Sequence, residues 1–258
     1  MISLLKLVLF LIPAGFLAGI SSSAAGLASL VSYPALLMVG LPPVMANVTN
    51  TYSLLATGFS SIIASKQELN GKKKQIWQIL PLSILGVILG ALLLFWVPST
   101  IFKKIVPFFI MFAGIMVLVP NMRQKVAVVD EQVSVGKRLA VYLGIFLEGI
   151  YTGYFGAGGG VVLLALLIVI NRQNTFAVNN ALKNFTLAFA NVIGAVVYLF
   201  KAPILWKYVI PLAIGLWFGG LVGPKIVRVV SDRKMRIVCC ILSWILGISL
   251  FLQAYHLI

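Results

Sequence analysis

Long apolar runs, separated by short polar or basic stretches, follow one another along the whole chain. A helix needs about 20 apolar residues to cross a bilayer. In each half of the sequence two short runs precede longer ones, and the order is the same in both halves. The pattern predicts about eight to ten helical membrane segments, depending on whether the short runs span or re-enter. These lie at residues 4–20, 26–39, 47–65, 75–97, 105–120, 139–154, 160–170, 176–200, 208–222 and 237–255.

The composition supports this interpretation. Of 258 residues, 61% are hydrophobic and only 10% are charged, and the mean hydropathy is +1.09. Such a chain has too little polar surface to cover a water-soluble globule. We therefore predict an all-α integral membrane protein. The net charge of +15 does not indicate nucleic acid, because the basic residues lie between the apolar runs, where membrane topology places them.

The two halves share short motifs at a constant offset. The first Gly and Ile of "GISSSAAG" coincide with those of "GIYTGYFG", and so do the last glycines, Gly26 and Gly156. Coincidence between two Gly-rich apolar stretches is the alternative to duplication. The duplication predicts a first membrane repeat at 1–120, a cytoplasmic linker at 121–138 and a second repeat at 139–258. Each repeat would hold a short broken-helix hairpin and three transmembrane helices.

The basic loops give an orientation to each half. Lysines and arginines gather at 66–74, in the linker and at 225–236, and we expect all three loops to be cytoplasmic. The basic loop follows the third segment of the first half but the fourth segment of the second half. The two repeats are therefore predicted to be inverted relative to each other, with both termini external.

Five glycines fall between Gly153 and Gly160, inside an apolar segment that follows Glu148. In transporters with inverted repeats, short interrupted helices mark the binding site near the bilayer midplane, because their backbone groups face a cavity. Non-helical backbone cannot face lipid. The alternative is that these glycines only allow close helix packing. The cluster and its counterpart in the first half favour a binding site.

The same stretches resemble a known family. "AGISSSAAGLASLVSYPALLMVGLPP", "EGIYTGYFGAGGG" and "ALKNFTLAFANVIGAVVY" are similar to the sulfite exporter TauE/SafE family of bacterial membrane permeases. The resemblance implies a multi-pass protein of the bacterial inner membrane that transports a small anion, such as sulfite, a sulfonate or a related organic acid. The first half departs from the family pattern, because Leu27, Ala28 and Ser29 follow Gly26 in place of consecutive glycines. Hydroxyl groups are expected to substitute there for backbone coordination.

Small polar residues and glycines of the hairpins, together with residues of the helices that follow them, are the candidates for anion binding. On residues 47–65, Asn50, Ser53, Thr57 and Ser61 recur at helical spacing. For Thr57 and Ser61 we expect bonds to the carbonyls of their own helix instead. The predicted substrate-binding set is Ser22, Ser23, Gly26, Asn50, Thr152, Gly156, Gly158, Gly159, Asn180, Lys183 and Asn184.

Two charged residues lie within apolar segments, where charges usually have a function. Lys183 stands beside Asn180 and Asn184, and its ammonium would neutralise an anion or else snorkel to the cytoplasmic surface. Glu148 is a candidate proton carrier, and its alternative role is structural pairing with Lys183 or with a helix N-terminus. Both alternatives remain open from the sequence.

The sequence speaks against several other functions. A metal site or a catalytic cluster is not expected, since the chain has one His and the two cysteines are the neighbours Cys239 and Cys240. No enzyme activity and no cofactor are therefore predicted. The prediction is a secondary transporter that works by alternating access around paired hairpins. An anion channel and a non-transporting membrane scaffold are the alternatives.

Overall fold

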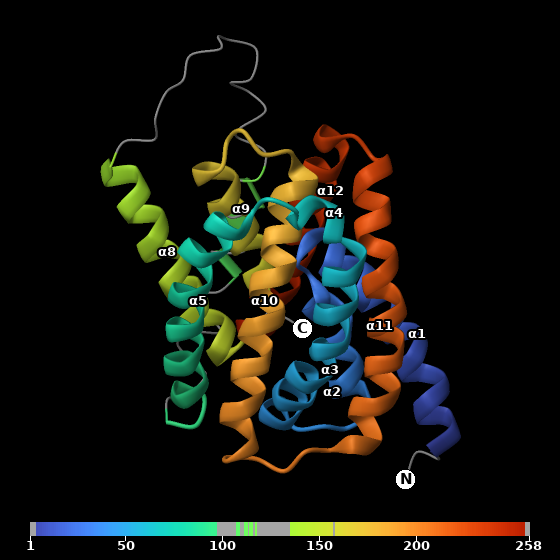
Figure 1. Cartoon of the computed structure of the whole chain (residues 1–258). Helices are drawn as coiled ribbons and strands as arrows, with labels where there is room; N and C mark the ends of the chain where they lie inside the picture. Colours follow the sequence, from blue (N-terminus) through green and yellow to red (C-terminus); the bar gives the residue numbers. More distant parts are fainter. Residues whose placement is uncertain are drawn as a thin grey trace.

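The computed structural model describes residues 4–96, 107–108, 111–112, 114–115, 117, 135–156 and 158–255. Every regular element in these ranges is a helix, and most of the longer helices run along the long direction of the molecule (Figure 1). Five of the described helices have segments long and apolar enough to cross a membrane: Leu4–Ala25, Lys73–Leu93, Phe176–Leu199, Trp206–Val229 and Ile237–Ala254. The predicted all-α membrane fold is confirmed.

The first membrane segment of the first half is longer than the predicted 4–20. α1 continues through the "SSSAA" stretch, where a break after residue 20 was expected, so that boundary was wrong. The hydroxyls of Ser21 and Ser23 donate to the carbonyls of Leu17 and Gly19 at 2.9 and 2.7 Å, so these polar residues are satisfied inside the helix. The elements of this half are α1 (Leu4–Ala25), η1 (Ala28–Leu30), α2 (Ser32–Met38), α3 (Pro43–Ala64), α4 (Lys66–Leu69) and α5 (Lys73–Leu93). The short elements η1 and α2 occupy the second predicted segment, 26–39.

The second half repeats this succession of a long helix, a short one and further long ones. α8 already begins at Val135, inside the predicted linker at 121–138. The rest of that linker, and most of the predicted segment at 105–120, lie outside the described residues. The elements are α8 (Val135–Tyr154), α9 (Gly159–Ile170), α10 (Phe176–Leu199), α11 (Trp206–Val229) and α12 (Asp232–Ala254).

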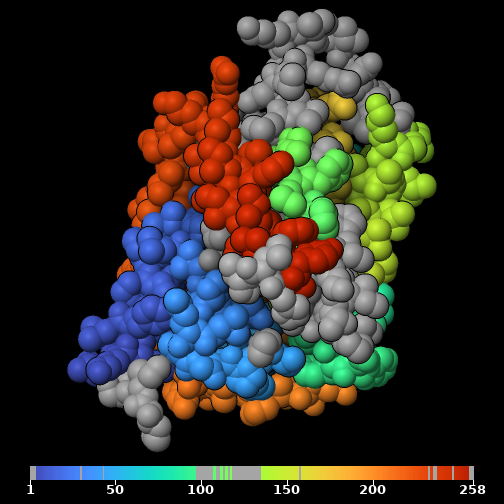
Figure 2. All heavy atoms as spheres, turned by 180° about the vertical axis from the view of Figure 1, so that it is seen from behind, coloured from blue at the N-terminus to red at the C-terminus, as the bar shows by residue number. Residues whose placement is uncertain are grey.

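α12 lies on the rear of the molecule, and Figure 2 shows it beside the described positions between 107 and 117. The rings of Phe108 and Phe251 meet edge to face with centroids 5.7 Å apart. A side chain on Gly114 would collide with Ser243, whose own hydroxyl donates to the carbonyl of Cys239 at 2.5 Å. This face is therefore held by small residues and aromatic contacts.

The connections after α4, α9 and α11 lie at one end of the molecule, the upper end in Figure 1. The Lys72 ammonium donates to Asn174 Oδ1 at 2.9 Å, which joins the α4–α5 connection to the α9–α10 connection. Arg228 at the end of α11 binds Glu68 of α4, with Nη2 and Oε2 2.7 Å apart. This hydrogen bond lowers the pKa of the Glu68 carboxyl below its ordinary value. The inverted orientation of the repeats stays a prediction.

Two helix pairs cross at glycines, α1 with α11 and α5 with α8. A Cβ atom on Gly19 of α1 would lie 2.6 Å from the carbonyl oxygen of Leu216 and 2.9 Å from the Cα of Gly219. On α5, a Cβ on Gly86 would lie 2.9 Å from the Cα of Gly149 in α8. The backbones touch at both crossings, as they do in membrane helix pairs built on small residues.

We expect Gly19→Ala to destabilise the fold, because its methyl group would meet only backbone atoms of α11 and would force the helices apart. Overpacking of this kind costs about 1–3 kcal/mol. The matched control is Gly136→Ala on α8, where a Cβ would meet nothing within 4 Å. The free energy of unfolding in mixed detergent micelles measures both. Equal stability of the two variants would contradict the tight crossing.

Candidate functional site

Both halves contain a helix that stops inside the molecule at a glycine with positive φ. α1 ends before Gly26 (φ 80°), and α8 ends before Gly156 (φ 71°). A third such residue, Gly158 (φ 78°), is the N-cap of α9. The two breaks meet, since a Cβ atom on Gly26 would lie 2.5 Å from the carbonyl carbon of Gly160. Only glycine combines this conformation with this closeness.

The C-terminal end of α1 is capped by three side chains of α10. The last carbonyls of a helix have no partner within it and carry partial negative charge. The amides of Asn180 and Asn184 both donate to the carbonyl of Ser23, at 2.7 and 2.9 Å. The Lys183 ammonium donates to the carbonyl of Ser22 at 3.0 Å and to Asn180 Oδ1 at 2.8 Å. A helix of the second half therefore completes the broken helix of the first.

The carbonyls at the end of α8 also accept hydrogen bonds from side chains of other helices. The amide of Asn47 on α3 donates to the carbonyl of Tyr154 at 3.2 Å. The hydroxyl of Tyr198, at the end of α10, donates to the carbonyl of Gly153 at 2.5 Å. The partners that the described structure shows at this end are neutral groups, whereas the end of α1 binds a lysine. The two ends differ in charge although their geometry is similar.

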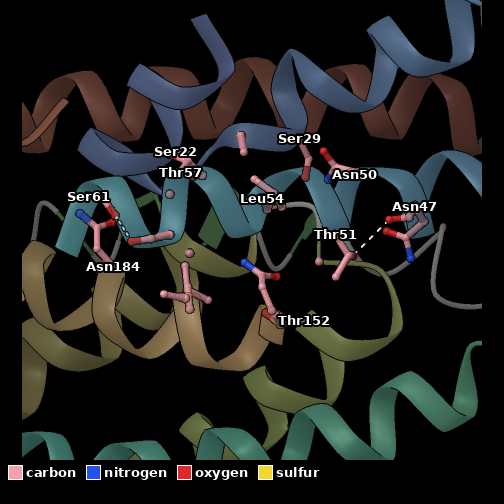
Figure 3. A pocket seen from close by; sticks show the side chains of 18 of the residues that line it. Ser22, Ser29, Asn47, Asn50, Thr51, Leu54, Thr57, Ser61, Thr152 and Asn184 are labelled. Atoms are coloured by element: carbon pink, nitrogen blue, oxygen red, sulfur yellow. Dashed lines mark hydrogen bonds between the residues drawn. The ribbon is translucent and has the colours of Figure 1, made fainter. Parts of the chain in front are cut away.

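A cavity of about 50 Å³ lies where the two breaks meet. In Figure 3, Ser22, Thr57, Ser61 and Asn184 lie toward one end of it, and Asn47, Asn50 and Thr51 lie toward the other. α3 contributes Asn47, Asn50, Thr51, Leu54, Thr57, Gly58 and Ser61 from one face, and α10 contributes Asn184, Leu187, Ala188 and Asn191. The described residues that line the cavity carry amides, hydroxyls, glycine backbone and a few apolar groups, and none of them is charged.

Two polar atoms in the cavity wall lack a partner among the described residues. They are Asn50 Oδ1 and Thr57 Oγ1, and their side chains belong to residues only 4% exposed. Buried polar atoms are nearly always hydrogen-bonded, so an unpartnered pair in a cavity wall indicates a ligand or water position. An amide can offer a donor or an acceptor, and a hydroxyl can offer both. The wall can therefore bind a small polar solute.

Six of the predicted substrate-binding residues line the cavity, and these are Ser22, Gly26, Asn50, Thr152, Gly156 and Asn184. Ser23, Gly158, Gly159, Asn180 and Lys183 are not among the lining residues. Ser23, Asn180 and Lys183 form or bind the end of α1, while Gly158 and Gly159 form the start of α9. Whether any of these residues binds a substrate stays a prediction.

The structure excludes one alternative and one expectation for individual side chains. Of the two alternatives for Lys183, snorkelling to the surface is excluded, because the residue is 0% exposed and its ammonium bonds to two buried groups. Thr57 does not bond to its own helix, since its hydroxyl has no partner among the described residues. Ser61 does donate to the carbonyl of Gly58 at 2.9 Å, as expected, and it lines the cavity as well.

Several lining residues lie outside the predicted set. Asn47 lies one turn before Asn50 on α3, Thr51 lies one turn after Asn47, and Asn191 lies two turns beyond Asn184 on α10, so helical spacing indicates all three. Gly160 belongs to the same glycine cluster as Gly158. Ser29 lies in η1, a short element that the apolar pattern does not predict.

Glu148 lies next to this site rather than in its wall. It is 3% exposed, and the Thr152 hydroxyl, one turn further along α8, donates to its Oε1. The expected alternative of pairing with Lys183 is not found, because the lysine binds Ser22 and Asn180. Gly159, in the first turn of α9, is the other neighbour, and a Cβ atom there would lie 3.0 Å from Glu148 Oε1. Glu148 thus lies beside the start of α9, and its pairing with that helix N-terminus stays a prediction.

The double cap on the Ser23 carbonyl predicts non-additive energetics. Asn184→Leu leaves the Asn180 amide on this carbonyl, and Asn180→Leu leaves the Asn184 amide. The double variant strands a buried acceptor, which costs about 1–3 kcal/mol. We expect it to lower the free energy of unfolding by more than the sum of the two single variants, measured as a double-mutant cycle. Strict additivity would show that the two amides do not share this acceptor.

Known proteins place the chain in a family. The sequence matches the family described as "Sulfite exporter TauE/SafE" over residues 11–250. A "Probable membrane transporter protein" of Haemophilus influenzae is 30% identical over 244 residues, which cover 94% of this chain and 93% of that protein. The "Probable membrane transporter protein ORF9" of a Sinorhizobium species is 29% identical over 97% of this chain and 94% of its own length. The "Probable membrane transporter protein YfcA" of Escherichia coli is 25% identical, with 93% and 87% covered.

No solved structure matches the chain at a significant level. The family match covers most of the sequence, and these relatives are named as membrane transporters rather than enzymes. The helices that are long and apolar enough to cross a bilayer agree with a multi-pass membrane protein. The chain belongs to the sulfite exporter TauE/SafE family of membrane transporters.

Proposed function

We propose that this transporter moves a small oxyanion, such as sulfite, a sulfonate or a related organic acid, by alternating access around the cavity between its two helix breaks. The observation that carries the proposal is the cavity wall itself. Two buried polar atoms, on Asn50 and Thr57, face a space that no described side chain fills. The family name supports the class of solute.

The size of the cavity suits a solute of a few heavy atoms. One water-sized position takes up about 10–15 Å³, so a volume of about 50 Å³ corresponds to roughly three to five such positions. A sulfite ion has four heavy atoms, and a small sulfonate has a few more. A larger organic acid would require the hairpins to move apart. Alternating access requires such a movement in any case.

The wall offers neutral hydrogen-bond donors, and positive charge lies behind it. α9 begins at Gly159, and Gly160 in its first turn lines the cavity. The N–H groups of Gly159 and Val161 already bond to the carbonyls of Gly156 and Gly158 at 3.3 and 3.0 Å, so it is the positive end of the helix dipole that favours an anion there. Lys183 does not line the cavity, but its ammonium donates to the carbonyl of Ser22, which does. Its charge would favour an anion through a low-dielectric interior without direct contact.

The arrangement of helices supports the inverted repeats that alternating access requires. α1 crosses α11 and α8 crosses α5, each pair at glycines. α3 of the first half supports the end of α8, and α10 of the second half supports the end of α1. In transporters of this design the two halves rock against each other around a fixed site at the midplane. A channel would have no need of such an exchange.

Removing single donors from the cavity tests the proposal. In proteoliposomes loaded with radiolabelled sulfite, we expect saturable flux and counterflow for the wild type. Asn50→Leu and Thr57→Val should each weaken apparent affinity by about threefold to tenfold, the worth of one neutral hydrogen bond. The control is Thr186→Val, since that buried hydroxyl donates to the carbonyl of Leu182 and does not line the cavity.

The same assay separates the other functions. Flux that rises linearly with sulfite concentration would indicate a channel, and no flux with any small oxyanion would indicate a scaffold. Saturable flux with unchanged affinity in both cavity variants would leave the transporter in place but move its binding site elsewhere.

A further inference from the structure

Glu148 is a buried carboxyl group with only one of its oxygens bonded. The Thr152 hydroxyl donates to Oε1, and Oε2 has no partner among the described residues. The residue is 3% exposed, so solvent water does not reach it in this conformation. Gly159, in the first turn of α9, is its neighbour. A Cβ atom placed on this glycine would lie 3.0 Å from Oε1. A carboxyl in this position needs a physical explanation.

No ion pair with Glu148 occurs within the part of the chain that the structure describes. α5, α9 and α10 pack against α8. α9 has no titratable side chain, and the lysines of α5 lie in its first turn. On α10, the Lys183 ammonium binds Ser22 and Asn180, and the Tyr198 hydroxyl binds Gly153. On α8 itself, Tyr151 interacts electrostatically with Glu148, and the other titratable groups of that helix are Lys137, Arg138, Tyr142 and Tyr154.

An ionised carboxylate without a cation is costly to bury. Transfer of an isolated charge into an apolar medium costs far more free energy than transfer of an unpaired neutral polar group. The helix N-terminus of α9 offsets only a small part of that cost. Glu148 therefore holds a proton in this conformation, and it loses the proton only when water or a hydrogen-bonded path reaches it.

Thr152 provides that path. Its hydroxyl bonds to Glu148 Oε1, and the same residue lines the cavity between the helix breaks. We propose that Glu148 is a proton-binding site that exchanges its proton with the cavity through the Thr152 hydroxyl, and that a proton and an anion occupy the transporter together. This inference rests on the proposed function, because it assigns the coupling ion of the same cavity.

The proton step leaves every other bond unchanged. Release begins when the Thr152 hydroxyl rotates its proton from Glu148 Oε1 toward a water molecule in the cavity and the carboxyl group presents its proton to Thr152 Oγ1 from Oε1. Thr152 Oγ1 then accepts this proton and passes its own to the water. The products are the Glu148 carboxylate and one hydronium ion in the cavity, with the threonine hydroxyl again donating to Oε1. In the reverse direction the same two transfers reload the carboxyl group.

An anion in the cavity makes the carboxylate form less favourable, because like charges would then lie close together in a low-dielectric interior. Anion binding therefore favours proton binding, and the proton favours the anion by the same factor. In the pH range in which Glu148 titrates, the transporter should therefore take up a proton when it binds its substrate.

Infrared spectroscopy of the purified full-length protein tests the proton site without any anion. We expect a carboxylic acid band at neutral pH that disappears in Glu148→Gln. In D₂O the band should shift quickly in the wild type and in Thr152→Ser, but at least about tenfold more slowly in Thr152→Val, which lacks the hydroxyl. Thr186→Val is the matched control and should behave as the wild type. A spectrum without a Glu148-dependent acid band would overturn the proposal, and equal exchange rates would overturn the role of Thr152.

Methanesulfonate is the probe for coupling, because it does not titrate near neutral pH. It should raise the pH at which the acid band disappears in the wild type. At the pH where half of that band remains, methanesulfonate should make the weakly buffered wild type take up protons, which a pH indicator reports, and Glu148→Gln should take up none. Binding without either effect would overturn the coupling while the proposed transporter stands. If methanesulfonate and sulfite both fail to raise the thermal stability of the wild type, the proposed function fails, and the anion-free spectra still decide whether Glu148 is a proton site.

Discussion

The structure depends on how two helices end inside a membrane protein. α1 stops at Ala25 and α8 stops at Tyr154, and in lipid each terminal carbonyl must find a partner within the protein. Asn180, Lys183 and Asn184 supply those partners for α1, and side chains of α3 and α10 supply them for α8. The end of α1 is thus completed by the second half of the chain, and the end of α8 by one helix from each half. The halves cannot be positioned independently, and a polar cavity results where the breaks meet.

This arrangement gives some side chains two functions. Asn184 donates to the Ser23 carbonyl and also lines the cavity, so a shift of α1 relative to α10 changes both contacts. Lys183 binds the negative end of α1 and at the same time places its amino group behind the cavity wall. The glycine crossings of α1 with α11 and of α5 with α8 allow the backbones this closeness. A substrate that binds at the breaks would therefore be sensed by both halves.

Much of the fold could be predicted because it follows from apolar length and glycine position. Gly26 and Gly156, matched from sequence alone, both have positive φ at the end of a long helix. The end of α1 could not be predicted from polarity, because its serine hydroxyls donate to carbonyls one turn earlier and so remain inside the helix. The burial of Lys183 depends on a contact between residues far apart in sequence. Helical spacing correctly predicted that Asn50 and Asn184 lie at the candidate site. It could not show that Asn180 binds the end of α1 and does not line the cavity.

Locating a bound substrate analogue tests most directly the proposal that the substrate binds where the two broken helices meet. Selenite is a heavier analogue of sulfite, and its selenium scatters strongly enough to be located in a crystal by anomalous diffraction. We expect one selenium peak in the cavity, within hydrogen-bonding reach of Asn50, Thr57 and Asn184. A selenium peak found only beside the lysines of the 66–74 loop, with the cavity empty, would contradict it.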